Sequence, residues 1–103
     1  MAFLKIQITK YISNDFPAFI ECSFKDAHNI KQKIIDKVPV LTTKDINENT
    51  EFPIDINIPI TIKNKLKDLN NKQILTINIE KPLGLESTDG ETCFEVFTNQ
   101  IVN

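Results

Sequence analysis

The sequence predicts a small all-β fold, either a partly open barrel or a compact sandwich of about six short strands, in one domain over residues 1–103. Isoleucine outnumbers alanine by seventeen to three, and isoleucine packs well on a half-buried sheet, whereas alanine is the best helix former. Isoleucine also occupies every second position from Ile54 to Ile62, and a period of two has no helical explanation. Residues that favour turns separate several other short segments of this alternating kind.

The first two predicted strands cover residues 3–11 and 18–25, where apolar and polar residues alternate. Their apolar faces carry Leu4, Ile6 and Ile8 in the first strand and Ile20, Cys22 and Phe24 in the second. Residues 13–15 between them have the short polar side chains of a turn, and Pro17 sets the restart of the chain. We therefore expect two half-buried strands in succession.

The segment from Asp26 to Val38 allows two interpretations. Asp26 could cap a helix near residues 27–37, because several apolar residues fall on one helical face: Ala27, Ile30, Ile34, Ile35 and Val38. Alternatively, residues 26–29 form a hairpin turn in which Asn29 adopts the left-handed backbone, and the strand that follows turns Ile30, Ile34 and Val38 inward. We favour the hairpin, since the neighbouring segments are strands, and keep an α+β fold with one helix as the alternative.

The isoleucine-rich segment is the clearest strand in the sequence, but it is too long to stay straight. Over residues 52–69 it would extend about 60 Å, whereas a domain of this size has a radius of gyration of about 13 Å. We expect the bend at Pro59, which cannot donate to a ladder and so suits a sheet edge or a bulge.

The remaining elements follow from turn chemistry and alternation. Proline disfavours helical backbone in the residue before it, so Val38-Pro39-Val40 is expected to be extended. The other expected elements are a polar loop over 42–51, turns at 69–72, 81–84 and 88–90, and strands over 73–80, 85–87 and 92–97.

Composition disfavours several function classes. The net charge of −2 gives no chain-wide basic field for nucleic acid, and no apolar run approaches the ~20 residues of a membrane-spanning helix. The N-terminal residues lack the pattern of a secretory signal, so we expect a cytoplasmic location. The only glycines, Gly84 and Gly90, do not open a helix, which excludes a phosphate-binding loop, and we expect no cofactor.

Metal binding and catalysis have few candidate residues. Cys22, Cys93 and His28 together fall short of the four ligands of a structural zinc site, so no metal is expected. We interpret the two cysteines as buried thiols, with a disulfide between them as the minor alternative. Either cysteine with His28 would be the sole nucleophile and base pair, but His28 falls in a predicted turn, and we expect a solvated histidine. No catalytic residue is assigned, and the chain is not expected to be an enzyme.

Two groups of charged residues are candidates for binding. Residues 80–103 carry five acids and one lysine, and four of the acids could form an acidic surface for a basic partner or simply be solvated: Glu86, Asp89, Glu91 and Glu95. The lysine rows could contact phosphates, as in oligonucleotide-binding barrels, or protect strand edges: Lys31, Lys33 and Lys37, then Lys63, Lys65 and Lys67. Tyr11 is the only tyrosine and tryptophan is absent, so few aromatic residues are present to stack bases, and edge protection is favoured.

Short fragments between residues 18 and 97 carry a resemblance: Glu21-Cys22, Asp26-Ala27, Lys37-Val38-Pro39-Val40, Pro82, Gly84, Glu86-Ser87, Asp89-Gly90, Phe94 and Val96. This pattern resembles a group of small, uncharacterised bacterial β-domain proteins. Asn29 stands where a second glycine would be expected in the turn. The resemblance implies a strand over residues 30–37 and a bacterial origin, and it implies no activity.

We therefore expect a non-enzymatic protein-binding module, with Glu86, Asp89, Glu91 and Glu95 as its binding residues. One form of such a module is an immunity-type neutraliser of a toxin. The alternative is a weak oligonucleotide-binding β-barrel, and a cysteine enzyme at Cys22 or Cys93 is a third class. A homo-oligomer could form through an open strand edge.

Overall fold

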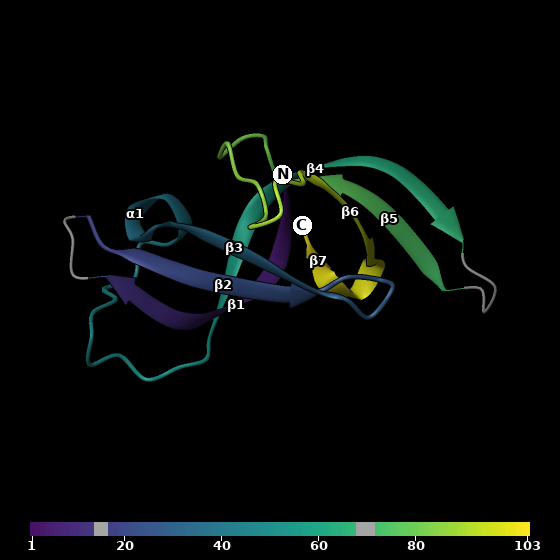
Figure 1. Cartoon of the computed structure of the whole chain (residues 1–103). Helices are drawn as coiled ribbons and strands as arrows, with labels where there is room; N and C mark the ends of the chain where they lie inside the picture. The colour runs from purple at the N-terminus through teal and green to yellow at the C-terminus, as the bar shows by residue number, and fades with distance from the viewer. Residues whose placement is uncertain (14–16, 68–71) are drawn as a thin grey trace.

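The computed structural model describes residues 1–13, 17–67 and 72–103, and these form one antiparallel sheet that curls into a half-barrel (Figure 1). Across the sheet the strand order is β3-β2-β1-β4-β5-β6, and β7 pairs with β1. The elements are β1 (Ala2–Ser13), β2 (Phe19–Lys25), β3 (Lys31–Lys37), α1 (Val38–Leu41), β4 (Ile54–Lys67), β5 (Gln73–Asn78), β6 (Cys93–Phe97), the 3₁₀ turn η1 (Thr98–Gln100) and β7 (Ile101–Val102). The predicted all-β, partly open barrel is confirmed.

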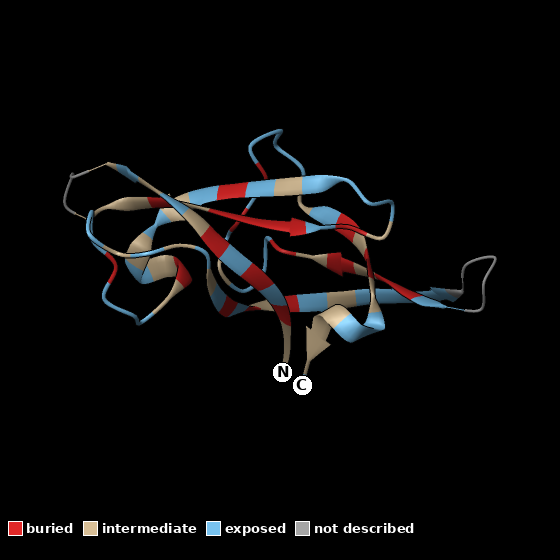
Figure 2. Cartoon of the chain, turned by 90° about the horizontal axis from the view of Figure 1, so that it is seen from below, coloured by how far each residue is buried: buried red, intermediate tan, exposed pale blue. Residues whose placement is uncertain are grey.

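The centre of the core lies on the inner face of the neighbouring strands β1 and β4. Their register places Leu4 opposite Ile58, Ile6 opposite Ile56 and Ile8 opposite Ile54, so each inward position of one strand meets an apolar partner. Figure 2 shows the resulting alternation of buried and exposed residues along the strands. Removing one isoleucine side chain from water in this way stabilises the folded protein by roughly 1.5–3 kcal/mol. The predicted inward alternation from 54 to 62 is confirmed at its centre, where Ile56, Ile58 and Ile60 are buried.

Strand β4 is continuous through the predicted bend. It pairs with β1 as far as Ile60 and with β5 from Thr61 onward, and Figure 1 shows it curving between these two partners. The ladder irregularity lies between Ile62 and Asn64 rather than at Pro59. Among the described residues, each half of β4 has a ladder on one side only, which is the edge position that a proline tolerates.

The hairpin interpretation of residues 26–38 is confirmed, and the helix near 27–37 is wrong. Asn29 has a φ of 62°, which is the left-handed backbone expected in this turn. The carboxylate of Asp26 fixes the turn by accepting the backbone N–H groups of His28 (2.9 Å) and Ile30 (3.0 Å). Of the three residues predicted to face inward, Ile34 is buried, Ile30 is exposed and Val38 lies in α1.

Two local predictions are wrong. Val38–Leu41 forms a single helical turn instead of an extended segment. Pro39 is tolerated there because it lies in the first turn, where no backbone N–H donates within the helix. This turn buries Leu41 against the core. Residues 85–87 form a loop rather than a strand, and no ladder joins them to a neighbouring strand in the described part of the sheet. Leu85 and Ser87 are nevertheless both buried in this loop.

The other turn and loop predictions have mixed outcomes. No helix or strand interrupts residues 42–51, and the chain turns at 81–83 and again at 88–90, as expected. The predicted turns at 13–15 and 69–72 lie, apart from Ser13 and Lys72, outside the described residues. In the described part of the chain, no helix has the length and hydropathy needed to cross a bilayer.

The two end strands of the sheet approach each other through the β2–β3 hairpin. The backbone N–H of Ala27 in the hairpin turn donates to the carbonyl of Glu95 in β6 at 2.7 Å. Beside this bond, the rings of Phe24 and Phe94 pack edge to face, with their centroids 5.4 Å apart. Because of these contacts, the tip of the β2–β3 hairpin lies against β6 and apart from β1. One groove lies at the contact with β6, and another lies where the hairpin leaves β1.

Candidate functional site

An acidic groove lies where the β2–β3 turn meets β6. Its volume is about 600 Å³, and its charged lining consists of Asp26, His28, Asp89, Glu91 and Glu95, with Lys31 at the rim. The structure therefore brings together three of the four acids predicted to bind a partner. The fourth, Glu86, is exposed and does not line the groove.

The buried hydroxyl of Ser87 positions two of these acids. It accepts the backbone N–H groups of Asp89 (3.3 Å) and Glu91 (3.1 Å), while the N–H of Ser87 donates to the carbonyl of Glu91 at 2.8 Å. Gly90 closes the turn with a φ of 81°, a conformation that glycine adopts without strain. In the described part of the structure, the carboxylates of Asp89 and Glu91 have no hydrogen-bond or ion-pair partner, so both are open to a ligand.

The third acid, Glu95, is paired with the histidine of the turn. Nε2 of His28 lies 2.6 Å from Oε1 of Glu95, and both side chains are partly exposed. The hydrogen bond with Glu95 is the largest effect and raises the pKa of His28. Desolvation lowers this pKa in part, and the negative charges of Glu95 and Asp26 raise it further. His28 is thus the solvated turn histidine that the sequence predicts, with a carboxylate bound to it.

Among the described residues, no hydrogen bond joins either cysteine to this histidine. Cys22 is buried, and burial raises the pKa of its thiol to about 12, so it stays protonated at neutral pH. Cys93 is exposed and lines the acidic groove, which corrects the prediction of two buried thiols. Both thiols are free, and Nε2 of His28 is bound to Glu95. Among the residues described, no three His, Cys, Asp or Glu side chains are placed to hold a metal ion.

The two predicted lysine rows lie on strands that are not neighbours. Lys31, Lys33 and Lys37 are exposed on β3, the end strand of the sheet, while Lys63 and Lys65 are exposed on β4. Strands β2 and β1 separate them. The row on β3 therefore occupies the position in which lysines discourage pairing with another edge.

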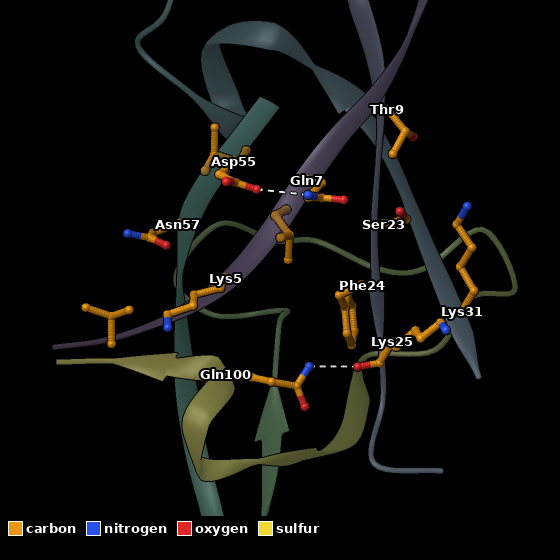
Figure 3. Close-up of a pocket in the computed structure, with 13 residues that line it drawn as sticks. Lys5, Gln7, Thr9, Ser23, Phe24, Lys25, Lys31, Asp55, Asn57 and Gln100 are labelled. Carbon is orange, nitrogen blue, oxygen red and sulfur yellow. Dashed lines mark hydrogen bonds between the residues drawn. The ribbon is translucent and has the colours of Figure 1, made fainter. Parts of the chain in front are cut away.

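A second groove opens where β2 leaves β1, and we call it the basic cleft. The β1–β2 ladder ends at the pair Gln7 and Ser23, and the short β7 pairs with β1 at Phe3 and Leu4. The opening between these ladders has a volume of about 750 Å³. Below it, Nε2 of Gln100 donates to the carbonyl of Lys25 at 2.7 Å and closes the cleft on that side (Figure 3).

The basic cleft combines lysines at its rim with apolar side chains beneath. Lys5 lies on one side and Lys25 and Lys31 lie on the other, with Phe24 between them (Figure 3). Among the described residues, Asp55 is the single acid in the lining, and its carboxylate accepts Nε2 of Gln7 at 3.0 Å. The sequence did not indicate this site, because alternation shows which residues face outward but not that a hairpin leaves its neighbouring strand.

No family model matches the chain, and no curated protein or solved structure matches it.

Proposed function

We propose that this protein is a non-enzymatic protein-binding module, and that its acidic groove binds a basic segment of another protein. The observation that supports this is the convergence of Asp89, Glu91 and Glu95 on one groove, with the first two carboxylates unpaired among the described residues. The Ser87 hydroxyl already holds the backbone at Asp89 and Glu91 in place, so this part of the chain loses little freedom on binding, which favours affinity.

The chemistry of the groove fits a lysine- or arginine-rich segment. Asp26 is occupied by the turn, so it supplies negative potential rather than a direct contact. Asp89 and Glu91 can accept charge-assisted hydrogen bonds, and the field of all the groove acids accelerates encounter with a positive partner. Neutralisation of a toxin is one form of such binding, and it stays a prediction, as does the cytoplasmic location.

The proposal is tested with a labelled lysine-rich peptide as the probe. Fluorescence anisotropy is measured for the native protein and for the double variant Asp89→Asn/Glu91→Gln. Loss of two charge-assisted contacts is expected to weaken binding about tenfold or more, and added salt should weaken binding to the native protein. The matched control is Asp45→Asn/Glu48→Gln, which removes two exposed acids from the 42–51 loop and should leave affinity within about twofold.

Three results would contradict the proposal: no binding at low salt, equal loss of affinity in both double variants, or unchanged affinity in the groove variant. A short single-stranded oligonucleotide serves as a further probe for the alternative function. If the protein binds that oligonucleotide and not the peptide, the result would contradict the protein-binding function and support the oligonucleotide-binding barrel.

A further inference from the structure

We propose that the basic cleft binds a small amphipathic anion, with an apolar body and one carboxylate or phosphate head group. This site is independent of the function proposed above. The two grooves share Lys31 at their rims, and the other charged residues of each groove are its own.

The opening itself follows from the path of the β2–β3 hairpin. Because the tip of this hairpin is bonded to β6 at Ala27, β2 diverges from β1 beyond the pair Gln7 and Ser23. Strand β7 does not fill the space, since it pairs with β1 farther along, at Phe3 and Leu4. The resulting cleft of about 750 Å³ is within the size range of small-molecule sites.

The rim carries uncompensated positive charge. In the described part of the chain, the ammonium groups of Lys25 and Lys31 have no ion-pair partner, and Nζ of Lys5 contacts only the neutral backbone carbonyl of Asn99 at 3.3 Å. The lining therefore holds three lysines against Asp55. A single anionic head group between these lysines would gain charge-assisted hydrogen bonds, whereas a cation would be repelled.

The base of the cleft is apolar. Ile6, Phe24 and Ile56 line it from the core side, and each is buried in the protein as it stands. Because they leave only 3%, 6% and 7% of their surface exposed, an apolar ligand body would gain mainly van der Waals contact with this base and with the half-buried Val102. Phe24 is buried and its ring packs edge to face with Phe94, so the described lining offers no free aromatic face on which a base could stack, which favours a small amphiphile over an oligonucleotide.

The test is an NMR titration of the backbone amides with octanoate and, separately, with octyl phosphate, both kept below micelle formation. The largest shifts are expected at Ile6, Phe24 and Gln100 around the cleft. Octanol and octylammonium have the same chain with a neutral or a positive head, and both should bind about tenfold more weakly or worse. A preference between octanoate and octyl phosphate identifies the head group, and either preference supports the site.

Charge variants separate this site from the acidic groove. Lys5→Gln/Lys25→Gln should weaken octanoate binding about fivefold or more, while the amide introduced at position 5 keeps a donor for the Asn99 carbonyl. Lys63→Gln/Lys65→Gln removes two exposed lysines elsewhere on the sheet and should leave affinity within about twofold. The Lys5/Lys25 variant should bind the lysine-rich peptide as the native protein does. The proposals for the two sites can therefore be contradicted independently of each other.

Several outcomes would overturn the assignment. Equal affinity for octanol and octanoate would show a purely apolar interaction, and shifts spread over the whole surface would show adventitious binding. Unchanged affinity in the Lys5/Lys25 variant, with a native amide spectrum, would exclude the lysines as the recognition element.

Discussion

Nε2 of His28 lies 2.6 Å from Oε1 of Glu95, and this contact joins the turn between β2 and β3 to strand β6. These strands belong to opposite ends of the sheet order, so the pair helps to hold the half-barrel curled. A backbone hydrogen bond from Ala27 to the carbonyl of the same Glu95 lies beside it. The same residues form one wall of the acidic groove, which ties the shape of the groove to the state of this histidine.

The first prediction concerns pH. Glu95 raises the pKa of His28 above its usual 6.5, so the contact stabilises the folded protein fully below the unfolded-state pKa. That stabilisation is lost as the pH rises through the higher pKa of the folded state. The variant Glu95→Gln should lower the pKa of His28, and NMR titration of this single histidine ring measures it directly.

The matched control for the histidine is Glu86→Gln, which removes an exposed acid that does not line the groove. It should leave the His28 titration close to that of the native protein. An identical pKa in the native protein and in Glu95→Gln would show that the carboxylate does not interact with the ring in solution.

The second prediction concerns the turn that carries His28. Asp26→Ala removes the acceptor of the His28 and Ile30 N–H groups and of Nε2 of Gln32, and should lower the free energy of unfolding by about 2–4 kcal/mol. Asp26→Asn keeps one carbonyl oxygen for the turn and should cost less. Urea denaturation measures both variants, and a larger loss in Asp26→Asn would disprove this role of the carboxylate.

The third prediction concerns the thiols. A maleimide or an aromatic disulfide reagent should label one thiol per native molecule, at Cys93, because Cys22 is buried and its pKa of about 12 keeps it protonated. Both thiols should react in urea. Cys93→Ser should abolish the native reaction. Rapid labelling of Cys22 in the folded protein would contradict its position in the core, and no native labelling would contradict the exposure of Cys93.

The fourth prediction concerns the isoleucine core. Ile58 on β4 lies opposite Leu4 of β1 and is fully buried in the core. Ile58→Ala should therefore lower the free energy of unfolding by about 2–5 kcal/mol. Ile35 lies on β3 with 41% of its surface exposed, and Ile35→Ala should cost well under half as much. Similar losses in both variants would mean that the alternation of buried and exposed isoleucines is not what stabilises the sheet.

Most of the sheet could be predicted, because its physical signal is local. A period of two with isoleucine at the inward positions has one explanation, and β4 follows it through Ile56, Ile58 and Ile60. The hairpin also has a local signal, since Asn29 tolerates positive φ and the Asp26 carboxylate can accept the backbone N–H groups of its own turn. The acids Asp89, Glu91 and Glu95 are near one another in the sequence, so the sequence alone predicts that they group together.

The features that could not be predicted depend on contacts distant in the sequence. The helical turn at Val38–Leu41 exists because Leu41 finds a place in the core, which overrides the local preference before Pro39. The basic cleft depends on residues 5, 25, 31 and 100, and no local pattern links them. The participation of His28 in the acidic groove likewise follows from the docking of the hairpin on β6.

Strand β4 also has a thermodynamic consequence. Its residues up to Ile60 are bonded to β1 and those from Thr61 to β5, so a single stretch of backbone belongs to both parts of the sheet. If either part of the sheet unfolded, β4 would lose one of its two ladders, and the other part would lose the support of a continuous strand. We therefore expect equilibrium unfolding to be one cooperative transition, with the fluorescence of Tyr11 and the far-ultraviolet circular dichroism giving the same midpoint.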